Sequence, residues 1–176
     1  EWGPPNLAVL NAGTHIPVTA ADLDAEPFRR LMETNVMGTV YGLTNLLPIM
    51  RRRGSGHIAV VSSLAGYRGL PTSAAYGASK AALINMCEAL RPELDAMGIK
   101  LQVITPGFVE TPLTDQNDFE MPFLVTVDEA TDQIMRGLAS DRFEVSFPRS
   151  FSLIMKVLRI LPDPLFFAMT RRMIKP

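Results

Sequence analysis

Residues 62–80, SSLAGYRGLPTSAAYGASK, are the stretch from which the rest of the chain is best interpreted. An apolar run at residues 58–61 predicts a strand that leads into a turn-rich loop, and a helix is predicted to follow. Tyr76 and Lys80 lie four residues apart, so that helix places both side chains on one face, one turn from each other. The two serines that open the stretch stand at the strand's carboxyl end, where an α/β sheet usually places its ligand cleft. A phenol, an ammonium and a hydroxyl are therefore predicted to converge.

These three groups suit proton transfer. A phenol with a pKa near 10 exchanges protons poorly at neutral pH unless its anion is stabilised. A cation about 4 Å away, at an effective dielectric of about 20, contributes roughly 4 kcal/mol, on the order of three pKa units before desolvation. Lys80 could thus lower the pKa of Tyr76 while the hydroxyl of Ser63 holds a carbonyl or alkoxide oxygen. The same spacing also fits a surface Tyr-Lys pair without a catalytic role.

Bulk properties exclude several classes of function. The chain has 176 residues, enough for one domain with a sizeable core. It is 47% hydrophobic and 20% charged with a net charge of −1, which gives no global attraction for nucleic acid. The single cysteine, Cys87, lies in the helix-like run ALINMCEAL and is predicted to be an inert buried thiol in a reducing, cytoplasmic setting. No apolar run is long enough to span a membrane, and no metal site is expected.

Strand and helix patterns alternate along the chain. This alternation favours an α/β fold with a doubly wound parallel sheet, Rossmann-like, and right-handed crossovers. The predicted strands are apolar enough to be covered on both faces, and the first is expected to be fully buried. We expect strands at residues 7–10, 57–61, 99–104 and 143–147, and helices at residues 24–53, 74–97 and 126–138.

Two further segments allow two interpretations each. Residues 108–127 form a long irregular loop whose apolar side chains fit either a hydrophobic substrate or a patch covered by the carboxyl-terminal tail. That tail, residues 149–176, predicts two short helices around Pro162-Asp163-Pro164 and carries six basic residues against one acid. It fits a lid or dimer-covering segment with solvated basic edges. It also fits an interfacial helix in peripheral contact with an anionic membrane.

Five short motifs occur in an order and spacing that resemble the short-chain dehydrogenase/reductase family. They are Asn11-Ala12-Gly13 after an apolar strand, Asn35 within TNVMGTV, Ser62-Ser63-x-Ala-Gly, Tyr76-x-x-x-Lys80 and Pro106-Gly107. The whole chain resembles the second half of that fold. In the family the catalytic serine stands 13 residues before the tyrosine, which here selects Ser63 over Ser62.

The resemblance implies specific roles. Tyr76 would be the acid/base, Lys80 would lower its pKa and bind the nicotinamide ribose, and Ser63 would orient the substrate oxygen. Asn35 would distort its helix and hold a water that links Lys80 to solvent. Thr111 would meet the cofactor's carboxamide. The residues implied to line the cofactor cleft are Asn11, Ala12, Gly13, Tyr76, Lys80, Pro106, Gly107, Val109 and Thr111.

The implied activity is that of an NAD(P)-dependent oxidoreductase that interconverts a carbonyl and a secondary alcohol. The implied partners are a small apolar substrate and further copies of the chain in a homo-oligomer, through the two long helices. Residues 1–148 would form the catalytic part and residues 149–176 the basic helical tail.

One departure from the family pattern is large. Family members begin with a strand and a glycine-rich turn, Thr-Gly-x-x-x-Gly-x-Gly, that leads into a helix whose amino end takes the pyrophosphate. No Gly-x-x-x-Gly-x-Gly occurs in this sequence, so the choice between NAD and NADP stays open. We therefore expect the carboxyl-terminal part of a longer reductase, with residues 7–10 as an apolar sheet edge. The alternative is a non-catalytic α/β fragment or interaction module that cannot bind a dinucleotide alone.

Overall fold

The computed structural model describes residues 3–116 and 119–174. Four strands in these ranges form one sheet in the order β1-β2-β3-β4, and every neighbouring pair is parallel. The predicted α/β class with a parallel, Rossmann-like sheet is confirmed. The strands are β1 (Leu7–Leu10), β2 (Gly56–Val61), β3 (Ile99–Pro106) and β4 (Glu144–Phe147).

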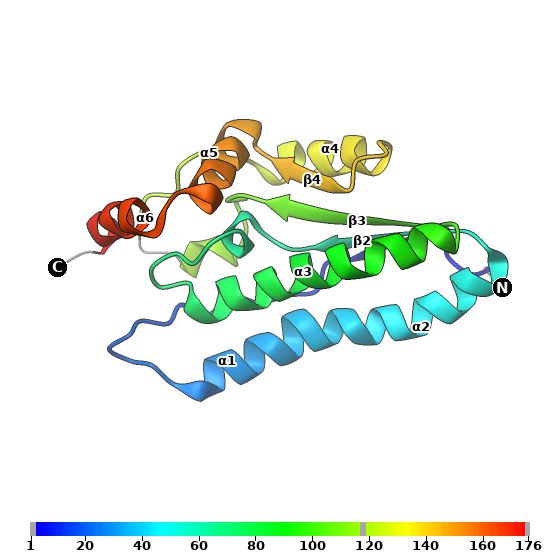
Figure 1. The fold of residues 1–176 in the computed structure, drawn as a ribbon, viewed down its shortest axis with the longest axis horizontal. Coiled ribbons are helices and arrows are strands. Elements are labelled where there is room, and N and C mark those ends of the chain that lie inside the picture. Colours follow the sequence, from blue (N-terminus) through cyan, green and yellow to red (C-terminus); the bar gives the residue numbers. More distant parts are fainter. Residues whose placement is uncertain (1–2, 117–118, 175–176) are drawn as a thin grey trace.

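Helices cover both faces of the sheet (Figure 1). One face carries α3 (Ala74–Ala96) and a long rod made of α1 (Ala25–Leu31), a π-helical segment (Met32–Met37) and α2 (Gly38–Arg53). The other face carries α4 (Val127–Leu138). Beyond β4 the chain forms α5 (Arg149–Ile160) and α6 (Asp163–Thr170), the two predicted tail helices. Short 3₁₀ turns occupy Leu64–Gly66, Thr114–Gln116 and Arg171–Met173.

The core follows from the alternation of side chains along the central strands. Ile58 and Val60 of β2 pack with α2 and α3, while Ala59 between them faces the α4 side. Met155 of α5 belongs to the larger cluster, so the tail shares the main hydrophobic core. Cys87 is fully buried there, and burial raises the pKa of its thiol to about 12, as expected of an inert cysteine.

Helix ends follow the capping signals in the sequence. The carboxylate of Asp24 accepts a hydrogen bond from the Glu26 amide at the start of α1. Gly54, at φ +68°, ends α2 in the left-handed conformation that favours glycine. Thr126 and Glu129 form a reciprocal capping box at the start of α4.

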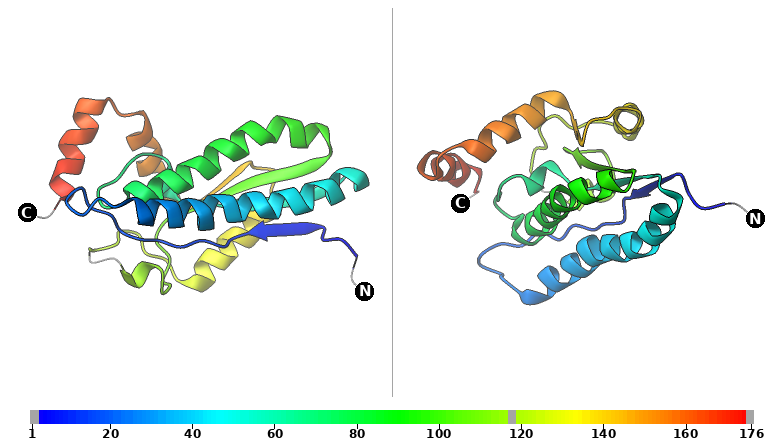
Figure 2. Two further views of the ribbon diagram at one scale, coloured as in Figure 1. Left: turned by 90° about the horizontal axis from the view of Figure 1, so that it is seen from below. Right: turned by 45° about the vertical axis from the view of Figure 1, so that its right-hand side comes forward.

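The tail lies toward the end of the molecule to which the strand arrows point (Figures 1 and 2).

Two local expectations are wrong. The first strand is not fully buried: β1 lies at an edge of the described sheet, and Leu7 and Val9 are each 42% exposed because no described strand flanks its other side. The edge position itself was expected. β3 runs two residues past its predicted end, since Pro106 still pairs with Phe147. The helix predicted over residues 24–53 is present as α1, the π-helical segment and α2.

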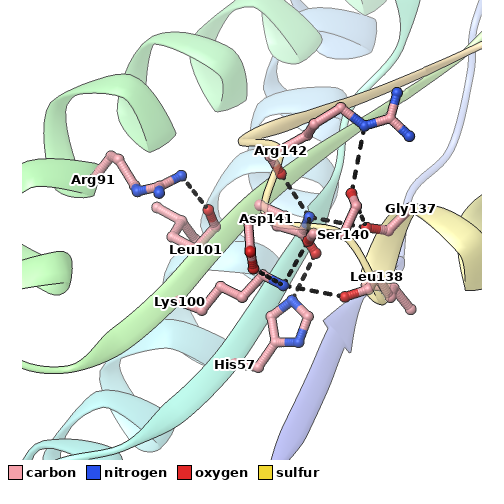
Figure 3. A network of polar contacts seen from close by, with 10 residues as sticks. His57, Arg91, Lys100, Leu101, Gly137, Leu138, Ser140, Asp141 and Arg142 are labelled. Atoms are coloured by element: carbon pink, nitrogen blue, oxygen red, sulfur yellow. Dashed lines mark hydrogen bonds and ion pairs between the residues drawn. The ribbon is translucent and has the colours of Figure 1, made fainter.

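A polar network joins β2, β3 and the end of α4 at the amino-terminal side of the sheet (Figure 3). The buried amide of Gln102 donates to three backbone carbonyls of residues 137–142 at 2.6–3.1 Å, and its oxygen lies 2.7 Å from Nε2 of His57. Burial, and then the charge of Lys100, lower the pKa of His57. These contacts satisfy carbonyls at the end of α4 and in the loop that follows it, so the network is structural. In the described part of the chain, no helix combines the length and apolarity needed to cross a membrane.

Candidate active site

Tyr76 and Lys80 stand on the first two turns of α3, and a close approach of backbones brings the Ser63 loop to them. A Cβ on Gly66 would lie 2.8 Å from the carbonyl carbon of Lys80, so only a glycine lets the 3₁₀ turn rest on the helix. Gly77 similarly admits the carbonyl of Ala65, which would meet an added Cβ at 3.1 Å. The glycines of the opening stretch therefore set the distance between the serine loop and the tyrosine.

The two neighbouring serines have different surroundings. Ser62 is buried, and its hydroxyl donates to the backbone carbonyl of Lys80 at 2.8 Å. The hydroxyl of Ser63 lies near the phenol of Tyr76 and acts to lower its pKa. Its Oγ also accepts from the amide of Ala65 at 3.2 Å. The structure thus brings Ser63, the serine selected from the sequence, to the tyrosine, and leaves Ser62 as a tie between strand and helix.

Lys80 is buried beside the tyrosine. Its side chain is only 4% exposed, and Nζ donates to the carbonyl of Val61 at 3.0 Å. The ammonium lies 5.7 Å from the centroid of the Tyr76 ring. Because burial disfavours the charged form, the pKa of Lys80 is lowered to about 8. This lysine is therefore still largely protonated at pH 7.

The pKa of Tyr76 departs from the expectation. Burial raises it, and the Ser63 hydroxyl lowers it only in part. The predicted net lowering by Lys80 is therefore wrong for this structure, because the cost of burying the phenolate outweighs its stabilisation. The ring of His15 packs edge-on against Tyr76, with centroids 4.7 Å apart, and adds to this burial. At neutral pH the phenol carries its proton.

Asn35 links the loop after β1 to α3. It is fully buried within the π-helical segment, so its helix is distorted as the resemblance implied. Its amide oxygen accepts from the backbone amide of Thr14 at 2.8 Å, and its Nδ2 donates to the Thr14 carbonyl and to Ser79 Oγ, both at 3.0 Å. Ser79 in turn donates to the carbonyl of Tyr76 at 2.7 Å. Asn35 thereby fixes the first turn of α3 against the end of β1.

The remaining candidates lie where the strands end. A Cβ on Gly13 would stand 3.3 Å from the amide oxygen of Asn35 and 3.4 Å from Nζ of Lys80, so Gly13 borders both polar groups. Asn11 and Ala12 precede it and are exposed at the carboxyl end of β1. Pro106, at the end of β3, offers its carbonyl 3.4 Å from Oγ of Ser63.

The more distant candidates form a turn of their own. Thr114 Oγ1 donates to the carbonyl of Val109 at 2.6 Å and accepts from the amide of Thr111 at 3.0 Å. Gly107, which precedes this turn, donates its amide to the carbonyl of Phe147 at 2.8 Å. The site therefore consists of a compact group around Tyr76 and a separate turn around Thr111.

Comparison with known proteins identifies the family. Residues 1–121 match the sequence model of the short chain dehydrogenases. A Myxococcus xanthus protein named as an uncharacterized oxidoreductase is 42% identical over 173 residues, which cover 98% of this chain and 68% of that protein. The chain belongs to the short-chain dehydrogenase family. The resemblance read from its motifs is confirmed.

Two further similar proteins show how much of a relative's length the chain covers. Human 17-beta-hydroxysteroid dehydrogenase 13 is 28% identical over 166 residues, which cover 93% of this chain and 55% of that protein. A short chain dehydrogenase of Burkholderia cenocepacia, solved in complex with NADP, has a TM-score of 0.82 at 25% identity, over 94% of this chain and 70% of that chain. The chain thus spans between 55% and 70% of the length of these relatives.

In this short-chain dehydrogenase the loop after Ser63 also holds the tail, and no sequence pattern predicted these contacts. Tyr67 hydrogen-bonds to the carboxylate of Glu144 and to Thr105 Oγ1, the latter at 3.2 Å. Burial, with Glu144 adding to it, raises the pKa of Tyr67 well above its ordinary value. The same carboxylate pairs with Lys156 of α5 at 2.6 Å.

Arg68 is the second missed residue, and it binds the junction of the two tail helices. Its guanidinium donates to the carbonyls of Leu158, at 2.7 Å, and Leu161. It pairs with Asp163 at 2.5 Å and lies 3.9 Å from the ring centroid of Phe166. No local pattern could have announced these contacts, since the residues involved lie 90 or more positions from Arg68.

The loop of residues 108–127 meets the tail through aromatic rings. Phe151 of α5 stacks on both Phe108 and Phe123, with centroids 5.6 Å apart in each pair. Phe119 packs edge-on against Phe108 at 5.8 Å. The tail therefore covers part of this apolar loop, as one of the two interpretations held, while Phe119 and Phe123 remain partly exposed.

Proposed function

We propose that the full-length protein is an NAD(P)-dependent oxidoreductase that interconverts a carbonyl and a secondary alcohol, with Tyr76 as its acid/base. The observation that carries the proposal is the compact group at the strand ends: a buried phenol whose pKa the nearby Ser63 hydroxyl acts to lower, with the Lys80 ammonium 5.7 Å from its ring. Family membership supports it, as does the name of oxidoreductase borne by the Myxococcus relative.

In carbonyl reduction, the hydroxyls of Ser63 and Tyr76 both hydrogen-bond to the substrate oxygen. Tyr76 then gives its proton to that oxygen as negative charge develops on it. Its raised pKa keeps the phenol protonated at neutral pH, which suits this direction. Alcohol oxidation runs the same contacts backwards, with the tyrosine taking the proton. The dinucleotide, when bound, supplies or accepts the hydride at the substrate carbon.

Lys80 has two roles in this proposal. With a pKa of about 8 it is largely an ammonium at pH 7, and its charge stabilises the phenolate left when Tyr76 gives up its proton. Its three donors also suit the hydroxyls of a ribose. Gly13 leaves space beside Nζ and the amide oxygen of Asn35, where one water bridging both would connect the lysine to solvent.

The residues of this chain fit the nicotinamide end of a dinucleotide. The bare backbone of Gly13 next to the Lys80 ammonium makes a cradle that a Cβ would begin to fill. Pro106, Gly107, Val109 and Thr111 would contact the nicotinamide from the end of β3, and Asn11 and Ala12 from the end of β1. The sequence holds no glycine-rich pyrophosphate turn, so the choice between NAD and NADP is not made by these residues.

The substrate proposed is a small apolar carbonyl compound or alcohol. The loop after β3 supports this, since Phe119 and Phe123 keep part of their rings exposed. Residues 1–148 would carry the catalytic part and residues 149–176 a separate functional element. We also propose that the protein works as a homo-oligomer, with α2 and α3 as the contact.

The test is reduction of medium-chain aldehydes and ketones by the full-length protein, followed by the absorbance of the reduced nicotinamide. Tyr76→Phe should lose about 10²- to 10⁴-fold in kcat. Tyr41→Phe is the matched control, because Tyr41 is exposed. Within the described residues, its hydroxyl hydrogen-bonds to Glu33. Equal turnover in Tyr76→Phe and the parent would overturn the acid/base, and absence of hydride transfer would favour the non-catalytic module.

A further inference from the structure

The tail helix α5 has two apolar sides, and the core uses only one. Met155 and Ser152 are buried against the body of the protein. On the opposite side Leu153, Val157 and Ile160 are exposed, with Ile160 82% exposed. A single exposed apolar side chain is common on a protein surface, but a contiguous group of them marks an interaction site. Ile160 belongs to such a group.

The exposed side of α5 continues onto α6. A groove of about 340 Å³ opens between the two helices, lined by Leu153, Ile154, Val157, Leu158, Leu161 and Met169. Past α6, Met173 and Ile174 are also exposed. We name this surface, from Leu153 to Ile174, the apolar tail face. It lies on the outside of the molecule, at the end where α5 and α6 project (Figure 2).

The tail itself is basic, and two acids that reach it from other elements are paired, Glu144 with Lys156 and Glu88 with Arg159. Between residues 149 and 174 the only acid is Asp163, and it is already paired with Arg68. Arg149 stands exposed at the start of α5, and Arg171 and Arg172 stand exposed after α6. An apolar surface flanked by arginines is complementary to a lipid surface with anionic headgroups.

The tail is held in one arrangement before any partner arrives. The Arg68 guanidinium fixes the end of α5 and the start of α6 together. Lys156 is bound to Glu144 of β4 at 2.6 Å, which ties the middle of α5 to the sheet. Since ordering costs are already met in the free protein, docking of the apolar tail face need not fold the segment.

We propose that the apolar tail face docks the protein on a membrane surface that carries anionic lipids, with α5 and α6 lying in the interface. A second copy of the chain suits this face less well. A two-fold interface would bring the arginines of one copy toward those of the other, whereas an anionic surface attracts both sets. Phe151 joins the tail to the apolar loop after β3, so docking would also place the proposed substrate entrance near the bilayer. That last point alone rests on the proposed function.

The test is flotation of the full-length protein with phosphatidylcholine vesicles, with and without phosphatidylserine. We expect binding to the anionic vesicles that falls as salt is added. Replacing both arginines, as R171Q/R172Q, should weaken partitioning by about fivefold per charge. Ile160→Glu should abolish detectable binding, while Leu23→Glu, at a 67% exposed leucine before α1, should leave it unchanged.

Two results would overturn the proposal. One is absence of binding to anionic vesicles, or binding that Ile160→Glu leaves intact. The other is an oligomer, seen by sedimentation velocity, that Ile160→Glu converts to monomer in a protein that ignores vesicles; the face would then belong to a second copy. Because flotation needs no turnover, these outcomes are independent of whether Tyr76 is the acid/base.

Discussion

Substitution of Lys80 by methionine should remove a pH-dependent cost from the folded protein. Burial lowers the pKa of Lys80 from 10.5 to about 8, so the native state disfavours the ammonium while the unfolded chain does not. The unfolded state therefore binds more protons between these two values, and stability rises with pH across that window. The cost of burying the ammonium is absent above pH 10.5, where both states are neutral. It grows as pH falls and is fully developed below pH 8.

The size of the effect follows from the shift. A difference of about 2.5 pKa units corresponds to about 3 kcal/mol in total, of which about 2.5 kcal/mol should appear between pH 7 and pH 10. Methionine keeps most of the side-chain volume and carries no proton. The free energy of unfolding of Lys80→Met minus that of the parent should therefore be about 2.5 kcal/mol larger at pH 7 than at pH 10.

The assay is urea unfolding of the cofactor-free, full-length protein at intervals across that range. Tyr76→Phe is the control, because it keeps Lys80 and should keep the parent's slope below pH 10. A stability difference between Lys80→Met and the parent that stays flat from pH 7 to pH 10 would refute the reasoning. The ammonium would then be hydrated in solution, and its burial beside Val61 would not be a property of the protein.

Three further substitutions test the surroundings of the site. Ser63→Ala should lower kcat by about 10²- to 10³-fold, whereas Ser62→Ala should mainly lower stability, by about 1 kcal/mol. Kinetics and thermal unfolding of both variants separate these effects. Equal losses of kcat in the two variants would contradict the assignment of Ser63. Gly66→Ala should destabilise by about 1–3 kcal/mol because its Cβ meets the backbone of α3, while Gly69→Ala, with nothing within 4 Å, should not; urea midpoints decide between them. Arg68→Met should raise hydrogen exchange across residues 158–166 by an amount equivalent to about 2–4 kcal/mol, and unchanged exchange would mean that the guanidinium does not hold the tail.

Local patterns were enough to predict much of the fold. Alternating strand and helix signals gave the parallel sheet, and the helices expected at residues 24–53, 74–97 and 126–138 are present within a residue or two of those bounds. Helical spacing put Tyr76 and Lys80 on one face of α3. These features depend on residues a few positions apart, which is why a sequence displays them directly.

What was missed depends on contacts between distant segments. Arg68 carries no local signal, and its partners lie in a tail about 90 residues away. Gln102, fully buried in a strand, is explained only by the carbonyls at and after the end of α4 that it satisfies. The apolar composition of residues 7–10 suggested full burial, but exposure depends on which strands flank them, and β1 lies at the edge of the described sheet.

The pKa of Tyr76 illustrates a related difficulty. The spacing of Tyr76 and Lys80 indicated that the lysine charge would dominate the pKa of the tyrosine, and that value did not include the effect of burial. In the structure burial comes first, and the Ser63 hydroxyl is the opposing effect. The phenol is consequently better suited to giving a proton at neutral pH than to taking one.

The most direct test of the central claim is the single-turnover rate constant for carbonyl reduction by the full-length protein, measured across pH for the parent and Tyr76→Phe. If Tyr76 gives the proton, the substitution should lower the rate constant by about 10²- to 10⁴-fold. The decline of the parent's rate at high pH, where the phenol ionises, should also disappear from the residual activity. An unchanged rate constant in a folded Tyr76→Phe variant would contradict the account.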